Sequence, residues 1–268
     1  MKRYTKKLSP SLSSGDQMTV TKAHTEKDVA NAYKKKDVAQ QYIKERFSFS
    51  WSKLLHEMQV TTVKKAVKKY NPQHIVELAP GPARIATDLE PISGTMVEFS
   101  EEMIHIAKQR LKANSAWNII HGNAFSLSTM NLSCDFLYTF RFIRHFKQEE
   151  RTKLYKEIYN TLSDRGILIF DVVNAKVRQK LENKKEKFNP KIAIHDAIYS
   201  KKSFAEEMKN NGFEVISMIP VIHYFSLQSW ISYKFDHRIK PFSKLSVYLM
   251  EKIPSNQPLE WICICRKE

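Results

Sequence analysis

The chain has 268 residues, of which 42% are hydrophobic, 27% are charged and only six are glycine. This composition excludes collagen-like, linker-like and strongly disordered chains, and the length suits one large domain or two small ones. The formal net charge is +16, and no uncharged apolar run reaches the roughly 18 residues that a transmembrane helix needs.

The first residues are basic, but no apolar stretch follows them, so we expect no secretory signal. The cysteines Cys134, Cys263 and Cys265 lack the spacing of a zinc site, and we expect no disulfide. Reduced cysteines are typical of the cytoplasm, which is the expected location.

Basic residues concentrate in the N-terminal part, where residues 1–70 hold 16 Lys and Arg against 6 Asp and Glu. One interpretation is a region that binds nucleic acid or anionic lipid, and the other is a solvated, Lys-rich helical surface. Lysine outnumbers arginine by 33 to 11, whereas phosphate-binding surfaces favour the bidentate arginine fork. The second interpretation is therefore favoured, and a nucleic-acid partner is not.

Residues 1–25 combine polar and basic residues without apolar periodicity, which predicts a flexible basic tail. Apolar residues at helical spacing predict helices at 27–46 and 51–70. Asn71-Pro72 ends the second helix. We expect residues 26–72 to form an N-terminal helical cap.

From residue 73 to 268 the pattern changes to short β-rich runs that alternate with helical segments. The predicted strands are 74–78, 95–99, 118–121, 135–140, 167–173, 213–219 and 259–265. The predicted helices are 83–90, 100–113, 148–162 and 201–211, and a further helical insertion is expected at about 221–256. Such alternation predicts an α/β fold with a parallel sheet and crossover helices.

The first predicted strand ends in an acidic residue, Glu77, and is followed by alternating small residues at Ala79, Gly81 and Ala83. A strand, a tight turn and a helix N-terminus form a pocket for a nucleotide-like ligand. Arg84 stands where a dinucleotide fingerprint needs its third glycine, which argues against a dinucleotide.

This acidic-x-Ala-x-Gly-x-Ala pattern resembles the first motif of class I S-adenosylmethionine-dependent methyltransferases. TMVEFSEEM, IIHGNAFSL, DFLYTFRFIRHF and LYKEIYNTLSDRGILIFDVVN resemble the following motifs in order, so the resemblance covers roughly residues 74–174. It implies a Rossmann-like, doubly wound sheet of seven strands in the order 3-2-1-4-5-7-6, with strand 7 antiparallel. It also implies S-adenosyl-L-methionine as cofactor and S-adenosyl-L-homocysteine as product.

The resemblance implies a set of cofactor-binding residues: Glu77, Ala79, Pro80, Gly81, Arg84, Glu98, Phe99, Met103, Asn123, Ala124, Thr139 and Phe140. A carboxylate at Glu98 suits both ribose hydroxyls, since each hydroxyl can donate to one of its oxygens. Ala79 and Ala83 stand where the family has glycine, and Asn123 stands where it has aspartate. We therefore expect somewhat weaker cofactor binding than is usual for the family.

The family's methyl acceptor lies beside the end of the fourth strand. Among the catalytic candidates His145, Arg141 and His223, the best base is His145, for which packing is the alternative role. The substrate-binding candidates are Tyr42, His56, Arg144, Tyr199 and Tyr224. Arg141 and Arg144 suit an anionic acceptor, with salt bridges to nearby acids as the alternative.

Two further pairs, His195-Asp196 and His223-Tyr224, fall beside predicted strand ends. No acidic residue follows the fourth strand to complete a magnesium site, so we expect no metal. The D/N-P-P-Y/F motif of amino-methylating nucleic-acid enzymes and the Pro-Cys loop of 5-methylcytosine enzymes are both missing.

We therefore expect an enzyme that methylates an oxygen or nitrogen of a small lipophilic or anionic metabolite. One alternative is a methyltransferase of RNA or protein that uses the basic N-terminal region, and another is a non-catalytic binding protein with this fold. The aromatic and basic insertion at 224–253 either caps the substrate pocket or forms an amphipathic surface for a lipophilic substrate or a membrane. The oligomeric state stays open.

Overall fold

The structure is a computed structural model that describes residues 48–89, 92–111, 116–186 and 196–268. The predicted tail at 1–25 and the predicted helix at 27–46 lie outside these residues, as do Tyr42 and His195.

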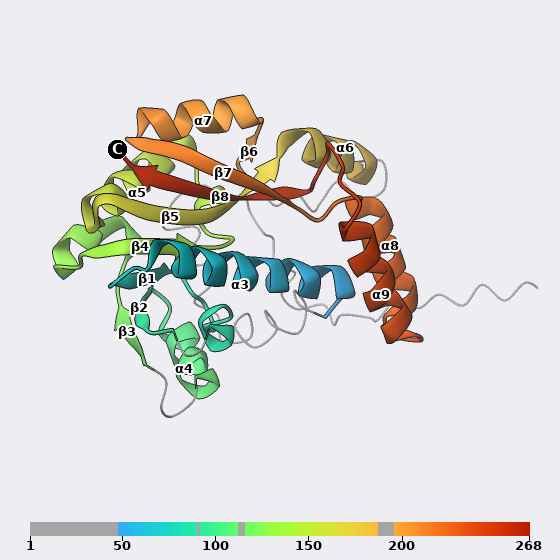
Figure 1. Cartoon of the computed structure of the whole chain (residues 1–268), viewed down its shortest axis with the longest axis horizontal. Coiled ribbons are helices and arrows are strands. Elements are labelled where there is room, and N and C mark those ends of the chain that lie inside the picture. Colours follow the sequence, from blue (N-terminus) through green and yellow to red (C-terminus); the bar gives the residue numbers. More distant parts are fainter. Residues whose placement is uncertain (1–47, 90–91, 112–115, 187–195) are drawn as a thin grey trace, which may run out of the picture.

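A single twisted sheet runs through the centre of the molecule (Figure 1). The strand order is β3-β2-β1-β4-β5-β8-β7, and a short strand, β6, pairs with β5. The pairs are parallel from β3 to β5, whereas β8 is antiparallel to both β5 and β7. The predicted strand order is therefore confirmed, with β7 and β8 as the predicted sixth and seventh strands.

The strands are β1 (Ile75–Leu78), β2 (Gly94–Glu98), β3 (Trp117–His121), β4 (Cys134–Thr139), β5 (Leu162–Asn174), β6 (Ile198–Tyr199), β7 (Phe213–Val221) and β8 (Glu260–Lys267). The α-helices are α3 (Ser50–Tyr70), α4 (Glu101–Arg110), α5 (Gln148–Thr161), α6 (Ala175–Glu186), α7 (Lys201–Asn210), α8 (Phe225–Phe235) and α9 (Lys240–Glu251). Three 3-10 helices, η1 (Ala86–Asp88), η2 (Ala124–Met130) and η3 (Ile143–His145), lie among these elements.

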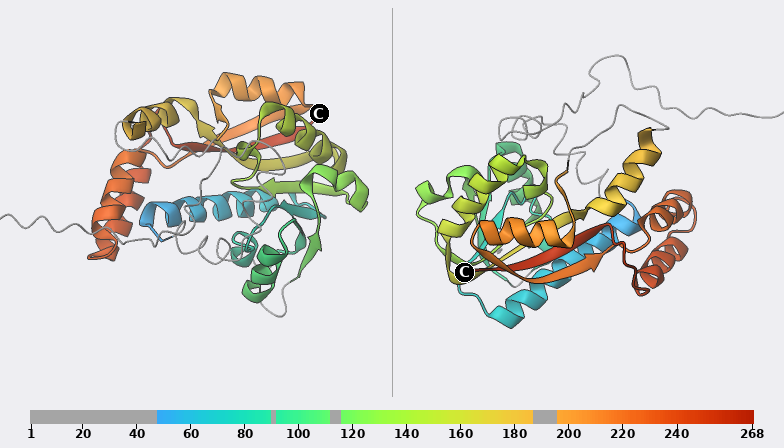
Figure 2. Two further views of the ribbon diagram at one scale, coloured as in Figure 1. Left: turned by 180° about the vertical axis from the view of Figure 1, so that it is seen from behind. Right: turned by 90° about the horizontal axis from the view of Figure 1, so that it is seen from above.

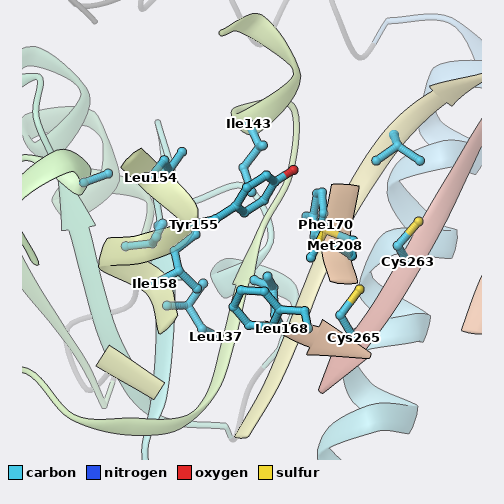
Figure 3. Close-up of a cluster of buried hydrophobic side chains, with 14 of the residues drawn as sticks. Leu137, Ile143, Leu154, Tyr155, Ile158, Leu168, Phe170, Met208, Cys263 and Cys265 are labelled. Carbon is cyan, nitrogen blue, oxygen red and sulfur yellow. The ribbon is translucent and has the colours of Figure 1, made fainter. Parts of the chain in front are cut away.

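Successive side chains of a strand point to opposite sides of the sheet. Each side packs into a hydrophobic core, so both faces of the sheet are buried. On β5, Leu168 and Phe170 pack with the α5 residues Leu154 and Tyr155, while Ile169 faces the core under α3. The first of these two cores is drawn in Figure 3. The apolar run at residues 167–170 of β5 therefore anchors helices on both faces.

The predicted helix at 83–90 is wrong: only η1 forms there, after a series of turns. Ala83, the first residue of the predicted span, has a φ of 53° and therefore belongs to the left-handed turns of the loop. The short β6 and the helix α6 were not predicted. The other strands and helices predicted within the described residues form, with ends shifted by a few residues.

The predicted insertion contains the helical hairpin α8–α9, which lies at one end of the molecule beside the first turn of α3 (Figure 2). The backbone N–H of Ser50 donates to Asp236 Oδ2 at 2.7 Å, so a residue between α8 and α9 supplies the N-terminal hydrogen bond of α3. Within the described residues, no helix has the length and apolar character needed to cross a membrane.

Candidate functional site

A cavity opens at the carboxyl ends of β1, β2 and β4, where ligands gather in open α/β sheets. Its walls combine the loop after β1, the β2–α4 junction, the loop after β3 and the segment after β4. The lining residues are Ala79, Gly81, Val97, Glu98, Phe99, Ser100, Met103, Gly122, Asn123, Ala124, Phe125, Phe140, Arg141, Phe142, His145 and Phe146.

The loop after β1 alternates left-handed residues with prolines. Ala79, Gly81 and Ala83 have φ values of 49°, 56° and 53°. The intervening prolines hold their own φ near the usual −65°, which fixes the alternation. A left-handed alanine costs roughly 1–2 kcal/mol, so the two alanines strain a loop that glycine would relax.

The carboxylate of Glu98 joins this loop to the end of β2. Its Oε2 accepts from the backbone N–H of Gly81 and its Oε1 from that of Ser100, each at 2.9 Å. Burial raises the pKa of Glu98, and the hydrogen bonds from Ser100 and Gly81 oppose that rise. A backbone hydrogen bond from Phe99 also reaches the carboxylate. A carboxylate has roughly four acceptor sites, so part of its capacity stays open to a ligand hydroxyl.

The loop after β3 uses its asparagine to begin η2. Asn123 Oδ1 accepts from the backbone N–H of Phe125 at 3.0 Å, which is an N-cap hydrogen bond. Beside it, the backbone N–H of Gly122 donates to the carbonyl of Glu98 at 2.9 Å. The side-chain oxygen of Asn123, a predicted cofactor-binding residue, therefore holds the loop in shape.

Three predicted cofactor-binding residues do not line the cavity but make contacts next to it: Glu77, Thr139 and Arg84. Glu77 accepts from the Tyr138 hydroxyl at 2.9 Å, and burial raises the pKa of its carboxyl to about 7. The Thr139 hydroxyl donates to the carbonyl of Leu78 at 2.8 Å, which ties β4 to the end of β1. These contacts hold the strand ends together.

Arg84 connects the loop after β1 to α3. It donates to Gln59 Oε1 at 2.7 Å and lies 2.5 Å from His56 Nδ1. His56 Nε2 in turn lies 2.5 Å from Asp88. Burial lowers the pKa of His56, which favours a neutral imidazole that accepts from Arg84 and donates to Asp88. His56, a predicted substrate-binding residue, thus belongs to this chain of contacts.

Arg144, the second predicted substrate-binding arginine, is buried among three carboxylates. Its Nη1 donates to Asp171 on β5 at 2.9 Å and to Glu260 on β8 at 2.7 Å. Its Nε lies 3.2 Å from Asp196 Oδ1. Arg144 is absent from the cavity wall, and its charge is balanced by these acids.

His145 lies on the cavity wall, and only one of its two ring nitrogens has a partner within the described residues. Its Nδ1 is 3.3 Å from Asp196 Oδ1, while its buried Nε2 has no hydrogen-bond partner within the described part of the chain. Burial lowers the pKa of His145, outweighing the opposite effect of Asp196. Burial alone would raise the pKa of Asp196, but the guanidinium of Arg144 holds it well below its usual range.

The remaining predicted residues lie away from the cavity wall. His223 contacts Ser255 Oγ at 3.0 Å through Nδ1. Tyr199 donates to Glu207 at 2.7 Å, which secures α7. Tyr224 donates to the carbonyl of Pro254 at 3.2 Å, beside α6 and α8. None of these three contributes to the cavity that contains Glu98, and Pro80 is also absent from its wall.

Three aromatic residues on the cavity wall were not predicted. Phe142 and Phe125 each pack edge-on against Phe146, with centroid separations of 5.1 and 5.0 Å. The aromatic repeat in the segment after β4 was the signal available in the sequence. These rings make the side of the cavity next to His145 apolar.

The described residues contain no group of three His, Cys, Asp or Glu side chains arranged to hold a metal ion. All three cysteines are buried and free, and burial raises the pKa of the Cys134 thiol to about 12.

Comparison with known proteins identifies the class of the fold. A family model described as a methyltransferase domain matches residues 75–166, and no curated protein matches the chain. The structure resembles magnesium protoporphyrin IX methyltransferase of Synechocystis PCC 6803 with bound S-adenosylmethionine: identity is 10%, coverage is 91% of this chain and 97% of that one, and the TM-score is 0.59.

Two other similar structures have the same fold. A methyltransferase of Thermotoga maritima, described as a possible histamine N-methyltransferase, shares 20% identity over 87% of this chain and 98% of that one, with a TM-score of 0.54. Human N-acetylserotonin methyltransferase shares 12% identity over 89% of this chain and 58% of that one, with a TM-score of 0.58.

The chain therefore has the fold of class I S-adenosylmethionine-dependent methyltransferases, and the resemblance inferred from the sequence is confirmed. Residues 75–166 form the part that a methyltransferase-domain model recognises.

The strain at Ala79 can be tested by Ala79→Gly. We expect unfolding in urea to require up to about 1 kcal/mol more free energy, because glycine adopts a positive φ without steric cost. Ala205→Gly, on the exposed side of the regular helix α7, is the matched control and should lose about 1 kcal/mol. A destabilised Ala79→Gly variant would contradict the assignment of strain.

Replacing Arg144 with methionine leaves three buried carboxylates without their shared cation. We expect a loss of about 3–5 kcal/mol in the free energy of unfolding at neutral pH. The deficit should shrink as the pH falls toward about 4, because protonation removes the uncompensated charge. Urea unfolding at several pH values measures this, and exposed Arg165→Met is the control. A deficit that is independent of pH would contradict the proposed charge balance.

Proposed function

We propose that this protein binds S-adenosylmethionine in the cavity and transfers its methyl group to an oxygen or nitrogen of a small acceptor. The observation that carries the proposal is the buried carboxylate of Glu98, which is fixed at the cavity wall by backbone donors from Gly81 and Ser100. A preorganised carboxylate of this kind matches the hydroxyl donors of a ribose.

The residues around Glu98 fit the remainder of the cofactor. The loop at Ala79 and Gly81 brings backbone close to the cavity without large side chains, which leaves space for the methionine part. Ala124 and Phe125 provide an apolar wall for the adenine on the other side of Glu98. S-adenosylmethionine supplies an electrophilic methyl group, so the protein has to position the acceptor and exclude water.

The acceptor side is formed by the segment after β4. Phe142 and Phe146 favour an acceptor with an apolar part and limit the access of water. Arg141 also lines the cavity, and its buried Nε has no hydrogen-bond partner within the described residues. We assign Arg141 to an anionic group of the acceptor.

His145 supplies the base when the acceptor carries a proton. Its lowered pKa keeps the imidazole neutral, and its unpartnered Nε2 can receive the proton. Asp196, near Nδ1, favours the tautomer that leaves Nε2 deprotonated and stabilises the imidazolium that forms.

Label transfer tests the function directly. The protein is incubated with S-adenosylmethionine labelled in the methyl group and a fractionated cell extract, and the label is followed into small metabolites, lipid, RNA and protein. Label in a small-molecule fraction supports the proposal, whereas label confined to RNA or protein overturns the acceptor class. Absence of transfer together with absence of S-adenosylhomocysteine binding overturns the whole assignment.

Glu98→Gln should weaken S-adenosylhomocysteine binding about tenfold to a hundredfold in a calorimetric titration. The reason is the loss of hydrogen bonds to a charged acceptor, which are worth roughly 1.5–3 kcal/mol. Glu101→Gln, on the exposed first turn of α4, is the matched control and should bind as the unmodified protein does. Equal affinities of the two variants would remove Glu98 from the ribose site.

The protonation of His145 can be followed by NMR, with His145→Gln assigning its resonance. We expect a midpoint below the roughly 6.5 of a free imidazole, because burial disfavours the charged ring. Asp196→Asn should lower the midpoint further, since Asp196 acts in the opposite direction. Methyl transfer that uses this base should then persist below about pH 6.5. A midpoint at or above that value contradicts the role of a neutral base.

A further inference from the structure

The helical hairpin α8–α9 exposes its apolar side chains. Among the described residues, every exposed large hydrophobic residue except Phe99 lies between residues 224 and 253. Tyr233 is 76% exposed, Leu245 57% and Trp230 52%. On α8, Leu227, Trp230 and Tyr233 follow one another at intervals of three residues, and on α9, Leu245 and Leu249 are four residues apart. Each helix therefore presents an apolar stripe to the outside.

The fully buried residues of the hairpin are mainly polar. The buried residues of α8 are Gln228 and Ser232, and those of α9 are Ser243 and Val247. Gln228 donates to the carbonyl of His223 at 2.6 Å. Ser232 Oγ accepts from the backbone N–H of Trp51 at 3.3 Å. Val247, Phe225 and Ile231 add apolar contacts with the core. The inner side of the hairpin therefore combines hydrogen bonds and apolar packing, and a second set of apolar side chains stays exposed on the outside.

The charges of the hairpin are divided in the same way. Its basic residues Lys234, Arg238, Lys240, Lys244 and Lys252 are all exposed. Its acidic residues face inward: Asp236 accepts from the backbone N–H of Ser50, and Glu251 accepts from those of Ile222 and His223. The outer surface is therefore both apolar and positive.

Two of the lysines lie over exposed rings. Lys234 Nζ is 4.9 Å from the ring centroid of Trp230, and Lys252 Nζ is 4.8 Å from that of Tyr248. An aromatic ring beside a long cationic side chain suits the boundary between lipid headgroups and acyl chains, where the ring enters the apolar layer and the ammonium reaches the phosphates.

We propose that the outer face of α8–α9 binds the surface of a bilayer that contains anionic lipids, with its apolar stripes inserted at the headgroup level. Charge complementarity selects this occupant, since five exposed cations match an anionic surface. Burial of the aliphatic residues Leu227, Leu245 and Leu249 among acyl chains is favourable, whereas RNA offers them no apolar surface of this kind. A second copy of the hairpin would bring like charges together.

The chain's own N-terminal part is not a suitable occupant either. Residues 1–47 hold eleven basic and five acidic residues, so they carry the same sign of charge as the hairpin. The membrane proposal does not depend on the methyl-transfer proposal, because the stripes and charges of α8–α9 lie outside the cavity wall.

Vesicle binding of the full chain tests the proposal. Trp230 is the tryptophan exposed on the hairpin, so its fluorescence should shift to the blue on addition of phosphatidylcholine vesicles that contain phosphatidylserine. Pure phosphatidylcholine vesicles should give little binding. Trp230→Phe should abolish the shift but retain co-sedimentation, which assigns the signal.

Variants on the exposed faces separate the two contributions without disturbing the core. Leu245→Gln with Leu249→Gln should reduce partitioning at least tenfold. Lys234→Gln and Lys252→Gln should each reduce it about fivefold, with a loss that is smaller in high salt. Lys201→Gln with Lys202→Gln on exposed α7 is the matched charge control and should partition like the unmodified chain.

Three results would overturn the proposal. The first is equal partitioning of the leucine variant and the unmodified chain. The second is equal binding to neutral and anionic vesicles. The third is absence of binding to the anionic vesicles. A dimer that Leu245→Gln dissociates, or RNA binding that the lysine variants abolish, would then identify a different occupant.

Discussion

The buried charge of Arg144 constrains the carboxyl edge of the sheet. A guanidinium removed from water needs partners on every side, and here Asp171, Glu260 and Asp196 supply them from β5, β8 and the residues before β6. Asp171 also accepts from the backbone N–H of Arg141 at 2.5 Å. The segment after β4, which carries the proposed acceptor side of the cavity, is thus fixed by electrostatics more than by a long helix or strand.

The shape of the proposed cofactor-binding wall of the cavity depends on backbone geometry. Proline alternates with residues at positive φ in the loop after β1, and the carboxylate of Glu98 fastens that loop to β2. Strain and hydrogen bonding act together: the loop is held in a conformation that alanine disfavours, so the cavity wall exists before any ligand arrives. Preorganisation of this kind lowers the ordering cost of binding.

Local sequence patterns predicted most elements, because strand and helix periodicities are properties of short segments. The strand order, and the placing of Gly81, Glu98 and His145 at one edge of the sheet, came from the resemblance to a known family. The patterns failed at residues 83–90, where the chain forms turns and the short helix η1. For Arg144 the sequence left two roles open, and the structure has the second, salt bridges to acidic residues. Its partners could not be identified from the sequence, because Asp171 and Glu260 lie 27 and 116 residues away along the chain. Pairing at such separations is decided by tertiary structure alone.

Helix α3 touches both proposed sites, and this gives it a mechanical role. Its first residue is held by Asp236 of the hairpin, and two turns further on Gln59 holds Arg84 of the loop after β1. A helix is stiff over this length, so it acts as a strut between the outer hairpin and the strained loop. A displacement of the hairpin would therefore shift α3, and through Gln59 and Arg84 it would shift the loop after β1 as well.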